Sequence, residues 1–199
     1  MRRVIGIGET ILDILFKNNQ PTVAVPGGSV FNGLVSLGRA GVNVTFISEV
    51  GGDRVGEIIL NFMKDNGICT DNVMVYPERK SPISLAFLND KNDAEYSFYK
   101  DYPTLRLDVD MPEVTSEDIV MFGSFYAITP QLRDKVKELL DKARKVGAII
   151  YYDVNFRASH KHEFMKLTPN IIENLEYADI VRGSSEDFEI MFGKSDGES

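Results

Sequence analysis

The chain has 199 residues, of which 43% are hydrophobic and 26% charged, proportions typical of a globular protein that buries its own core. Its formal net charge of -8 argues against a nucleic-acid partner, and no apolar run approaches the roughly 18 residues that a membrane-spanning helix needs. Cys69 is the only cysteine and no long apolar stretch follows Met1, so we expect a cytoplasmic protein without disulfides, a cysteine-rich zinc site or a membrane partner.

The first part of the chain predicts strands and helices in alternation. Short apolar runs bounded by turn residues are typical of buried strands, and apolar residues repeated every three or four positions are typical of a helix. Val30, Leu34 and Leu37 have this helical spacing. The expected elements are strands at 3–8, 12–17 and 22–25 around a hairpin turn at 18–21, a helix between Gly28 and Gly41, a strand at 44–50 and a helix at 54–66.

The second part interrupts this alternation and then resumes it. The expected elements are strands at 83–88 and 96–102 joined by a polar turn at 89–93, then a strand at 119–122, a helix at 131–145, a strand at 148–152, a helix at 164–177, a strand at 180–182 and a helix starting at 186–192. Strands separated by helices imply parallel crossovers and an open sheet with helices on both faces. The two hairpins do not fit that sheet, so residues 12–26 and 83–102 are expected to form a small β flap inserted into it.

Two polar clusters lie beyond predicted strands in the first part of the chain, where an open α/β sheet binds its ligands. The carboxylate of Asp13 can accept hydrogen bonds from two neighbouring hydroxyls of a polyol, and a turn or capping aspartate is the alternative. Gly27 and Gly28 precede a helix and allow a ligand to approach the backbone closely, with Asn32 one turn inside the helix. A structural loop with a tolerated asparagine is the alternative there.

Two more polar clusters follow strands in the second part. Asp153, Asn155 and Arg157 alternate along an extended segment, which places two polar groups and a guanidinium on one side, suited to hydroxyls and phosphate. A surface salt-bridge network is the alternative. Beyond the strand at 180–182, Ser184 or Ser185 can cap the last helix, with Glu186 or Asp187 favoured by the helix dipole.

Other reactive residue types in the chain have ordinary interpretations. His160 and His162 are too sparse to specify a metal, and Cys69 has no nearby histidine, so a solvated loop and a packed thiol are expected. Tyr96, Phe98 and Lys100 share one face of a predicted flap strand, which places an aromatic ring over a sugar or, alternatively, in the core.

Taken in order, Gly8-Glu9 with Asp13, Gly27-Gly28 with Asn32, Gly51-Gly52-Asp53 with Gly56, and Asp153 to Arg157 resemble the amino-terminal part of the PfkB (ribokinase-like) family of carbohydrate kinases. Within that family the chain is most similar to the fructokinase and 2-keto-3-deoxygluconate kinase types. The resemblance implies a three-layer α/β sandwich with a mostly parallel sheet, a β flap that closes over a sugar, and a carboxy-terminal part missing here. It also implies transfer of the γ-phosphoryl group of ATP to a hydroxyl of a ketose or sugar acid, assisted by Mg²⁺, in a homodimer.

The resemblance also implies roles for particular residues. The family's sugar contacts match Asp13, Gly27, Gly28 and Asn32, with Phe98 on the flap. Arg157 matches an arginine that approaches the substrate or the transferring phosphate, and Asn155 belongs to the same motif. Glu186 matches a glutamate that organises water around Mg²⁺ and so serves the nucleotide, although Gly183 stands where the family has asparagine.

One departure concerns catalysis. The family's Gly-Ala-Gly-Asp segment, which supplies the catalytic base and an anion-stabilising helix amino terminus, does not occur in these residues. Because phosphoryl transfer depends on such positioning and charge stabilisation, the 199 residues are expected to be an inactive amino-terminal fragment of the kinase. The alternatives are a non-catalytic sugar-binding or regulatory module and a nucleoside kinase of the same superfamily.

Overall fold

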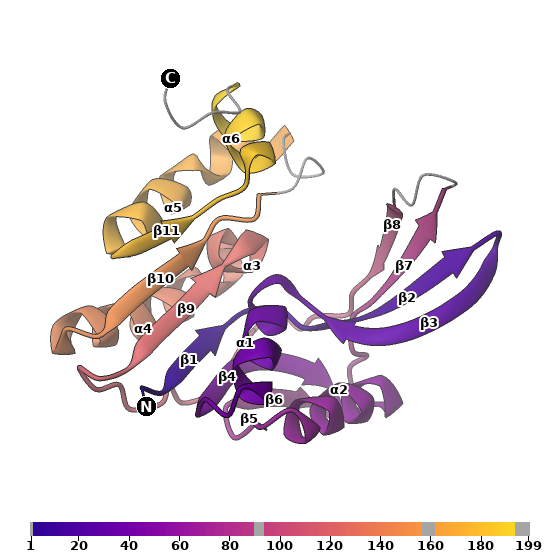
Figure 1. The fold of residues 1–199 in the computed structure, drawn as a ribbon, viewed down its shortest axis with the longest axis horizontal. Coiled ribbons are helices and arrows are strands. Elements are labelled where there is room, and N and C mark those ends of the chain that lie inside the picture. The colour runs from indigo at the N-terminus through magenta and orange to yellow at the C-terminus, as the bar shows by residue number, and fades with distance from the viewer. Residues whose placement is uncertain (1, 90–93, 157–161, 194–199) are drawn as a thin grey trace.

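A computed structural model describes residues 2–89, 94–156 and 162–193. Its main sheet has seven strands in the order β11-β10-β9-β1-β4-β5, with β6 also paired to β4, and every pairing is parallel. Figure 1 shows the strands with helices packed around them. The strands are β1 Val4–Ile7, β4 Val44–Gly51, β5 Ile68–Cys69, β6 Val73–Tyr76, β9 Ile119–Gly123, β10 Ile149–Asp153 and β11 Ile180–Arg182.

Two hydrophobic clusters pack on opposite faces of the main sheet. On β1, Ile5 and Ile7 join the cluster that contains α4 and α5, whereas Val4 joins the cluster that contains α1 and α2. This alternation follows from the two-residue period of a strand, and it gives the helix, sheet and helix layers expected from the sequence. The helices are α1 Ser29–Arg39, α2 Arg54–Asp65, α3 Ser124–Ile128, α4 Arg133–Val146, α5 Phe164–Tyr177 and α6 Ser185–Phe192. Among the described residues no helix is long and apolar enough to cross a membrane.

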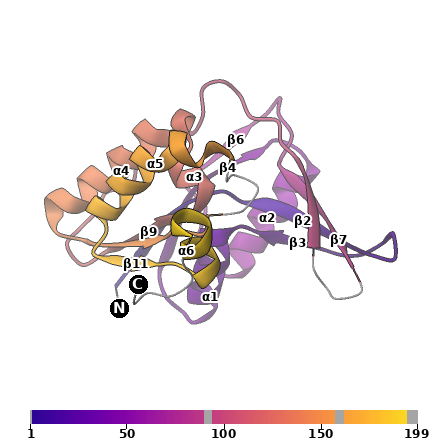
Figure 2. The same cartoon turned by 90° about the horizontal axis from the view of Figure 1, so that it is seen from above.

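A second sheet of four strands, here called the lid sheet, stands apart from the main sheet (Figures 1 and 2). Its order is β3-β2-β7-β8, with antiparallel β2–β3 and β7–β8 hairpins joined by a parallel β2–β7 pairing. The strands are β2 Ile11–Lys17, β3 Gln20–Gly27, β7 Ile83–Leu88 and β8 Ala94–Tyr99. The chain therefore enters the lid sheet directly after β1 and returns from it after β8.

The hairpin turn is shorter than expected. The sequence predicted a turn over 18–21, but Asn18 and Asn19 alone form it, with φ of 52° and 58°, and β3 already begins at Gln20. Two successive left-handed residues match the twist of the flanking strands, and asparagine adopts that conformation more readily than most residues. The expected turn at 89–93 lies almost entirely outside the described residues.

Several short elements were absent from the sequence-based expectation. The strands β5 and β6 and the five-residue helix α3 were missed, because each is too short to show a period. The helix expected at 131–145 is divided into a 3₁₀ turn at Pro130–Leu132 and α4. By contrast, α5 has the bounds predicted for it despite Pro169, and Ser184 caps α6 in a reciprocal capping box with Asp187.

An ion pair between the buried Asp118 and the partly exposed Arg3 joins the starts of β1 and β9 and provides a test of stability. Asp118 accepts hydrogen bonds from Arg3 Nε at 3.1 Å and NH2 at 2.7 Å, and from the Thr115 N–H at 2.8 Å. Burial alone raises the pKa of Asp118, but these hydrogen bonds outweigh it and lower the pKa below its ordinary value. A lowered carboxyl pKa stabilises the fold above the ordinary value, and the contribution is lost as the pH falls through the folded-state pKa.

We therefore expect Asp118→Asn to lower the free energy of unfolding by about 2–3 kcal/mol at pH 7, since it weakens the hydrogen bonds of a buried carboxylate. The difference from wild type should shrink near pH 3, below the ordinary pKa of 3.8, because the unfolded state then takes up a proton more readily than the folded state. Urea unfolding at the two pH values measures this, and an equal difference at both would contradict the lowered pKa.

Candidate functional site

The candidate site lies where the lid sheet joins the carboxyl ends of the main-sheet strands. Polar loops collect at this edge because parallel strands all end on the same side. The chain leaves β1 through Gly8, Glu9 and Thr10 and enters β2, so the lid sheet begins at the site itself (Figure 1). Ser48 OH fixes this crossing by donating to the Gly8 carbonyl at 2.8 Å.

Asp13 and Phe98 lie on the same face of the lid sheet. The register pairs Asp13 with Ser84 on β7, and Ser84 with Phe98 on β8. Residues in one register row point to one face, and neighbouring strands lie about 4.8 Å apart, so the two predicted site residues are about 10 Å apart across Ser84. The Phe98 side chain is exposed and stacks on Tyr96 with ring centroids 5.8 Å apart.

Asp13 is an oriented carboxylate. Its Oδ1 accepts a short hydrogen bond from the buried Ser84 hydroxyl, and its Oδ2 lies against Gly27, where a side chain would overlap it. Burial raises the pKa of Asp13, the Ser84 hydrogen bond lowers it in part, and the nearby Glu9 raises it. A carboxylate whose charged form is disfavoured by burial is a frequent sign of a functional site.

Gly27 and Gly28 form the junction between β3 and α1. Gly28 has a φ of 142°, which side chains rarely adopt, and an added Cβ would overlap the carbonyl oxygen of Glu9. The Gly28 carbonyl accepts the Asn32 N–H at 3.0 Å, which begins α1. Asn32 itself is exposed on the first turn of α1. The structure thus brings Asp13 and Gly27 into contact, and it places Asn32 one turn beyond them.

The end of β10 is tied to this junction. Asp153 is 6% exposed and accepts hydrogen bonds from Ser29 OH, in the first turn of α1, at 3.3 Å and from Arg182 NH1 at 2.9 Å. Side chains 124 residues apart in the chain are therefore hydrogen-bonded at the edge where ligands collect. Two of the polar clusters identified in the sequence meet here.

The segment after Asp153 does not follow the expected geometry. Asn155 has a φ of 39°, so the backbone turns there, whereas the sequence predicted an extended segment with three polar side chains on one side. Asparagine tolerates this conformation because its short polar side chain can bond locally. Val154 and Phe156 on either side are buried. Arg157 lies outside the described residues.

Glu186 lies on the first turn of α6 and is exposed. Its neighbour Asp187 is buried and accepts the N–H groups of Phe156 at 2.5 Å and Ser184 at 2.6 Å, which ties α6 to the segment after β10. Among the described residues no group of three or more His, Cys, Asp or Glu side chains is arranged to hold a metal ion.

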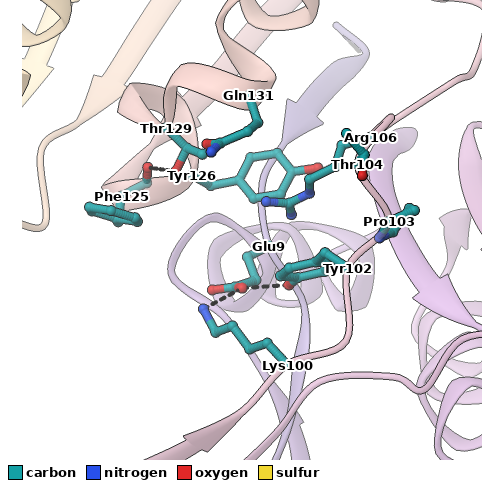
Figure 3. A pocket seen from close by; sticks show the side chains of 10 residues that line it. All are labelled: Glu9, Lys100, Tyr102, Pro103, Thr104, Arg106, Phe125, Tyr126, Thr129 and Gln131. Carbon is teal, nitrogen blue, oxygen red and sulfur yellow. Dashed lines mark hydrogen bonds and ion pairs between the residues drawn. The ribbon is translucent and has the colours of Figure 1, made fainter.

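A cavity of about 510 Å³ is lined in part by Glu9 (Figure 3), whose carbonyl oxygen lies against Gly28 at the junction. Its walls come from the loop after β1, the segment that returns from β8, and the residues that follow β9. The lining residues are Glu9, Lys100, Tyr102, Pro103, Thr104, Arg106, Phe125, Tyr126, Thr129 and Gln131. A pocket of this size, with aromatic walls and a few polar groups, is typical of small-molecule sites.

Polar and charged side chains that line this cavity form hydrogen bonds and ion pairs with one another. Glu9 Oε1 accepts hydrogen bonds from Lys100 Nζ at 2.7 Å and from Tyr102 OH at 2.6 Å (Figure 3). Burial and the Glu9 charge raise the pKa of Tyr102, so this phenol stays protonated and donates. The Arg106 guanidinium stacks over the Tyr102 ring at 3.6 Å from its centroid. The cavity therefore offers acceptors and donors beside aromatic faces, the combination that polyols need.

Sequence reasoning missed most of the cavity wall. The strand expected at 96–102 ends at Tyr99, so Lys100 and Tyr102 lie beyond it, in an irregular segment without a period that also carries Arg106. A charged residue, Glu49, inside the apolar run 44–50 was the available signal that a buried cation lies nearby.

Comparison with known proteins places this α/β fold among kinases that act on small molecules. The pfkB family carbohydrate kinase profile matches residues 1–199, and the chain belongs to that family. It is 26% identical over 200 residues to probable fructokinase-6 of Arabidopsis thaliana and 30% identical over 177 residues to 5-dehydro-2-deoxygluconokinase of Clostridium perfringens. These alignments cover 95% and 84% of this chain, but 52% and 51% of those proteins. The chain thus spans about half of their length.

Solved structures agree on the fold. A fructokinase from Vibrio cholerae superposes with a TM-score of 0.82 at 18% identity, covering 96% of this chain and 67% of that one. An uncharacterized sugar kinase from Pyrococcus horikoshii in complex with ATP superposes with a TM-score of 0.78 at 25% identity, covering 96% and 66%.

Proposed function

We propose that the protein is an ATP-dependent sugar kinase that transfers the γ-phosphoryl group to a hydroxyl of a ketose or sugar acid. Membership of the pfkB family supports the reaction class, and the names of the fructokinase relatives support the substrate class. The observation that carries the proposal is the geometry of Asp13. One carboxylate oxygen is fixed by Ser84, and the other lies at the Gly27 backbone, at the base of the lid sheet.

The predicted site residues that the structure describes have proposed roles in holding the sugar. Asp13 accepts hydrogen bonds from two neighbouring hydroxyls of the sugar. Because the carboxylate is charged, these hydrogen bonds are stronger than bonds between neutral groups. Gly27 and Gly28 leave the backbone open to close approach, and Asn32 and Asn155 supply amides nearby. Phe98 covers a sugar face from the lid sheet.

The remaining roles concern phosphoryl transfer. ATP is proposed as the donor of the phosphoryl group, and Arg157 is proposed to stabilise the charge on that group during transfer. Mg²⁺ bound by the phosphates would neutralise their charge, and Glu186 is proposed to contact it only through water. We assign no step to a metal held directly by this chain, and we propose that these 199 residues alone do not catalyse transfer.

We also propose a homodimer located in the cytoplasm. Val23, Val25 and Tyr96 expose apolar side chains on β3 and β8, the two edge strands of the lid sheet. Exposed edges and apolar side chains favour pairing with a second copy. Sedimentation of the purified protein measures this, and a monomer at micromolar concentration would contradict it.

A coupled ADP-release assay tests the proposed activity. The whole polypeptide that the gene encodes, here called the encoded polypeptide, is assayed with fructose, other ketoses, sugar acids and adenosine. The 199-residue chain is assayed in parallel. We expect ADP release with a ketose or sugar acid from the encoded polypeptide and none from the 199-residue chain. Release only with adenosine would favour a nucleoside kinase, and sugar binding without release would favour a non-catalytic sugar-binding module.

A further inference from the structure

Glu49 is a charged side chain in the core, at the carboxyl end of β4. It is 1% exposed, in a strand whose eight residues are all buried. Its carboxylate accepts hydrogen bonds from the Arg106 guanidinium, from Tyr76 OH at 2.9 Å and from the Leu107 N–H at 3.3 Å. Removing one partner of such a pair leaves a buried charge without compensation. Glu49 therefore joins β4, β6 and the segment that follows β8.

Leu107 has an unusual backbone where Glu49 holds it. Its φ of 52° lies in the left-handed region, which a residue with a bulky side chain rarely adopts. The side chain is fully buried in the core, and the N–H also donates to Tyr76 OH at 2.7 Å. Strained conformations persist only where the surroundings fix them, and they are concentrated at functional segments. The segment is thus fixed to the main sheet at Leu107.

The fixed segment carries part of the cavity wall. The Arg106 guanidinium lies over the Tyr102 ring, and Tyr102 OH donates to Glu9 (Figure 3). The carbonyl oxygen of Glu9 lies against Gly28, at the start of α1. A continuous set of contacts therefore runs from the buried Glu49 to the junction where the sugar is proposed to bind.

We propose that Glu49 is a positioning residue for sugar binding, because it anchors residues 100–107, through which the lid sheet returns to the main sheet. The anchor holds Tyr102 and Lys100 against Glu9 and so sets the cavity wall. This inference rests on the proposed sugar site. Glu49 is not among the residues that line the cavity, so its influence passes through two that are, Arg106 and Tyr126, whose hydroxyl donates to Glu49 at 3.4 Å, and from Arg106 to Tyr102.

Glu49→Gln tests the anchor because it keeps the shape of the side chain and removes its charge. Amide hydrogen exchange followed by mass spectrometry should be about tenfold faster in residues 100–107 than in wild type, and less changed in β9 and α4. Fructose, used as the probe in calorimetry, should bind about tenfold more weakly. Tyr76→Phe, which removes a single hydroxyl, should shift both quantities in the same direction by about threefold, and it serves if Glu49→Gln does not fold.

Asp118→Asn is the matched control. It neutralises another buried carboxylate paired with an arginine, at the opposite ends of the strands, and should leave fructose affinity and exchange in 100–107 unchanged. Exchange that rises equally throughout Glu49→Gln, or an unchanged fructose affinity, overturns the anchor. Failure of the wild-type protein to bind any sugar counts instead against the proposed function, and the exchange comparison then decides the anchor alone.

Discussion

Asp13→Ala is expected to abolish detectable fructose binding and sugar-dependent ADP release by the encoded polypeptide. Two hydrogen bonds to a carboxylate are worth about 3–6 kcal/mol together, which corresponds to a loss of affinity of roughly 100-fold to 20,000-fold. Calorimetry with fructose measures the affinity, and the coupled assay measures turnover. Retained affinity in Asp13→Ala would remove the residue from the site.

Glu95→Gln is a suitable control for Asp13→Ala. Glu95 is exposed on β8 of the same sheet, and its register partner Phe87 lies in the row that points to the other face. The control should therefore bind fructose as wild type does. If both variants lose binding equally, the effect comes from net charge or from the lid sheet as a whole.

The protonation of Asp13 adds a second signature. Because burial raises its pKa above the ordinary value of 3.8, the charged carboxylate costs stability, and this cost appears as the pH rises through the folded-state pKa. Asp13→Asn keeps an acceptor for Ser84 and removes that cost. It should thus weaken sugar binding without lowering the melting temperature at pH 7, a separation that a purely structural aspartate would not give.

The regular part of the fold is readable from the sequence. The helix α4 shows its buried stripe of Val136, Leu139, Leu140 and Ala143 directly, and Gly147 in the left-handed conformation closes it. The hairpins were separable from the main sheet because a parallel sheet needs helical crossovers and they offered none. Local period and turn chemistry are sufficient for elements of this kind.

The cavity could not be predicted in the same way. Arg106 and Glu49 are 57 residues apart, and their pairing depends on an irregular loop whose path is set by tertiary packing. The positive φ of Leu107 contradicts the preference of leucine, so propensity argues against the observed backbone. The turn at Asn155 escapes prediction for a related reason, because alternating polar residues favour an extended chain and nothing in that pattern signals the turn after β10.

Gly28→Ala is expected to be the most damaging small substitution at the site. The new Cβ would overlap the carbonyl oxygen of Glu9 and lie 3.1 Å from Phe31 Cβ, at a φ of 142°. Strain and overlap together should cost about 3 kcal/mol of stability. In a chain of this size that lowers the melting temperature by roughly 6–12 °C, and fructose binding should be lost because the loop at Glu9 must move.

Gly41→Ala separates the two causes of that loss. Gly41 also has a positive φ, of 79°, but no atom lies within 4 Å of an added Cβ, so only backbone strain of about 1 kcal/mol is expected. Its melting temperature should fall by roughly 2–4 °C, and fructose binding should remain. Equal melting temperatures for the two variants would mean that Gly28 does not touch Glu9. The loop after β1 would then not pack closely against the start of α1, and the proposed sugar site, which depends on that packing, would lose its support.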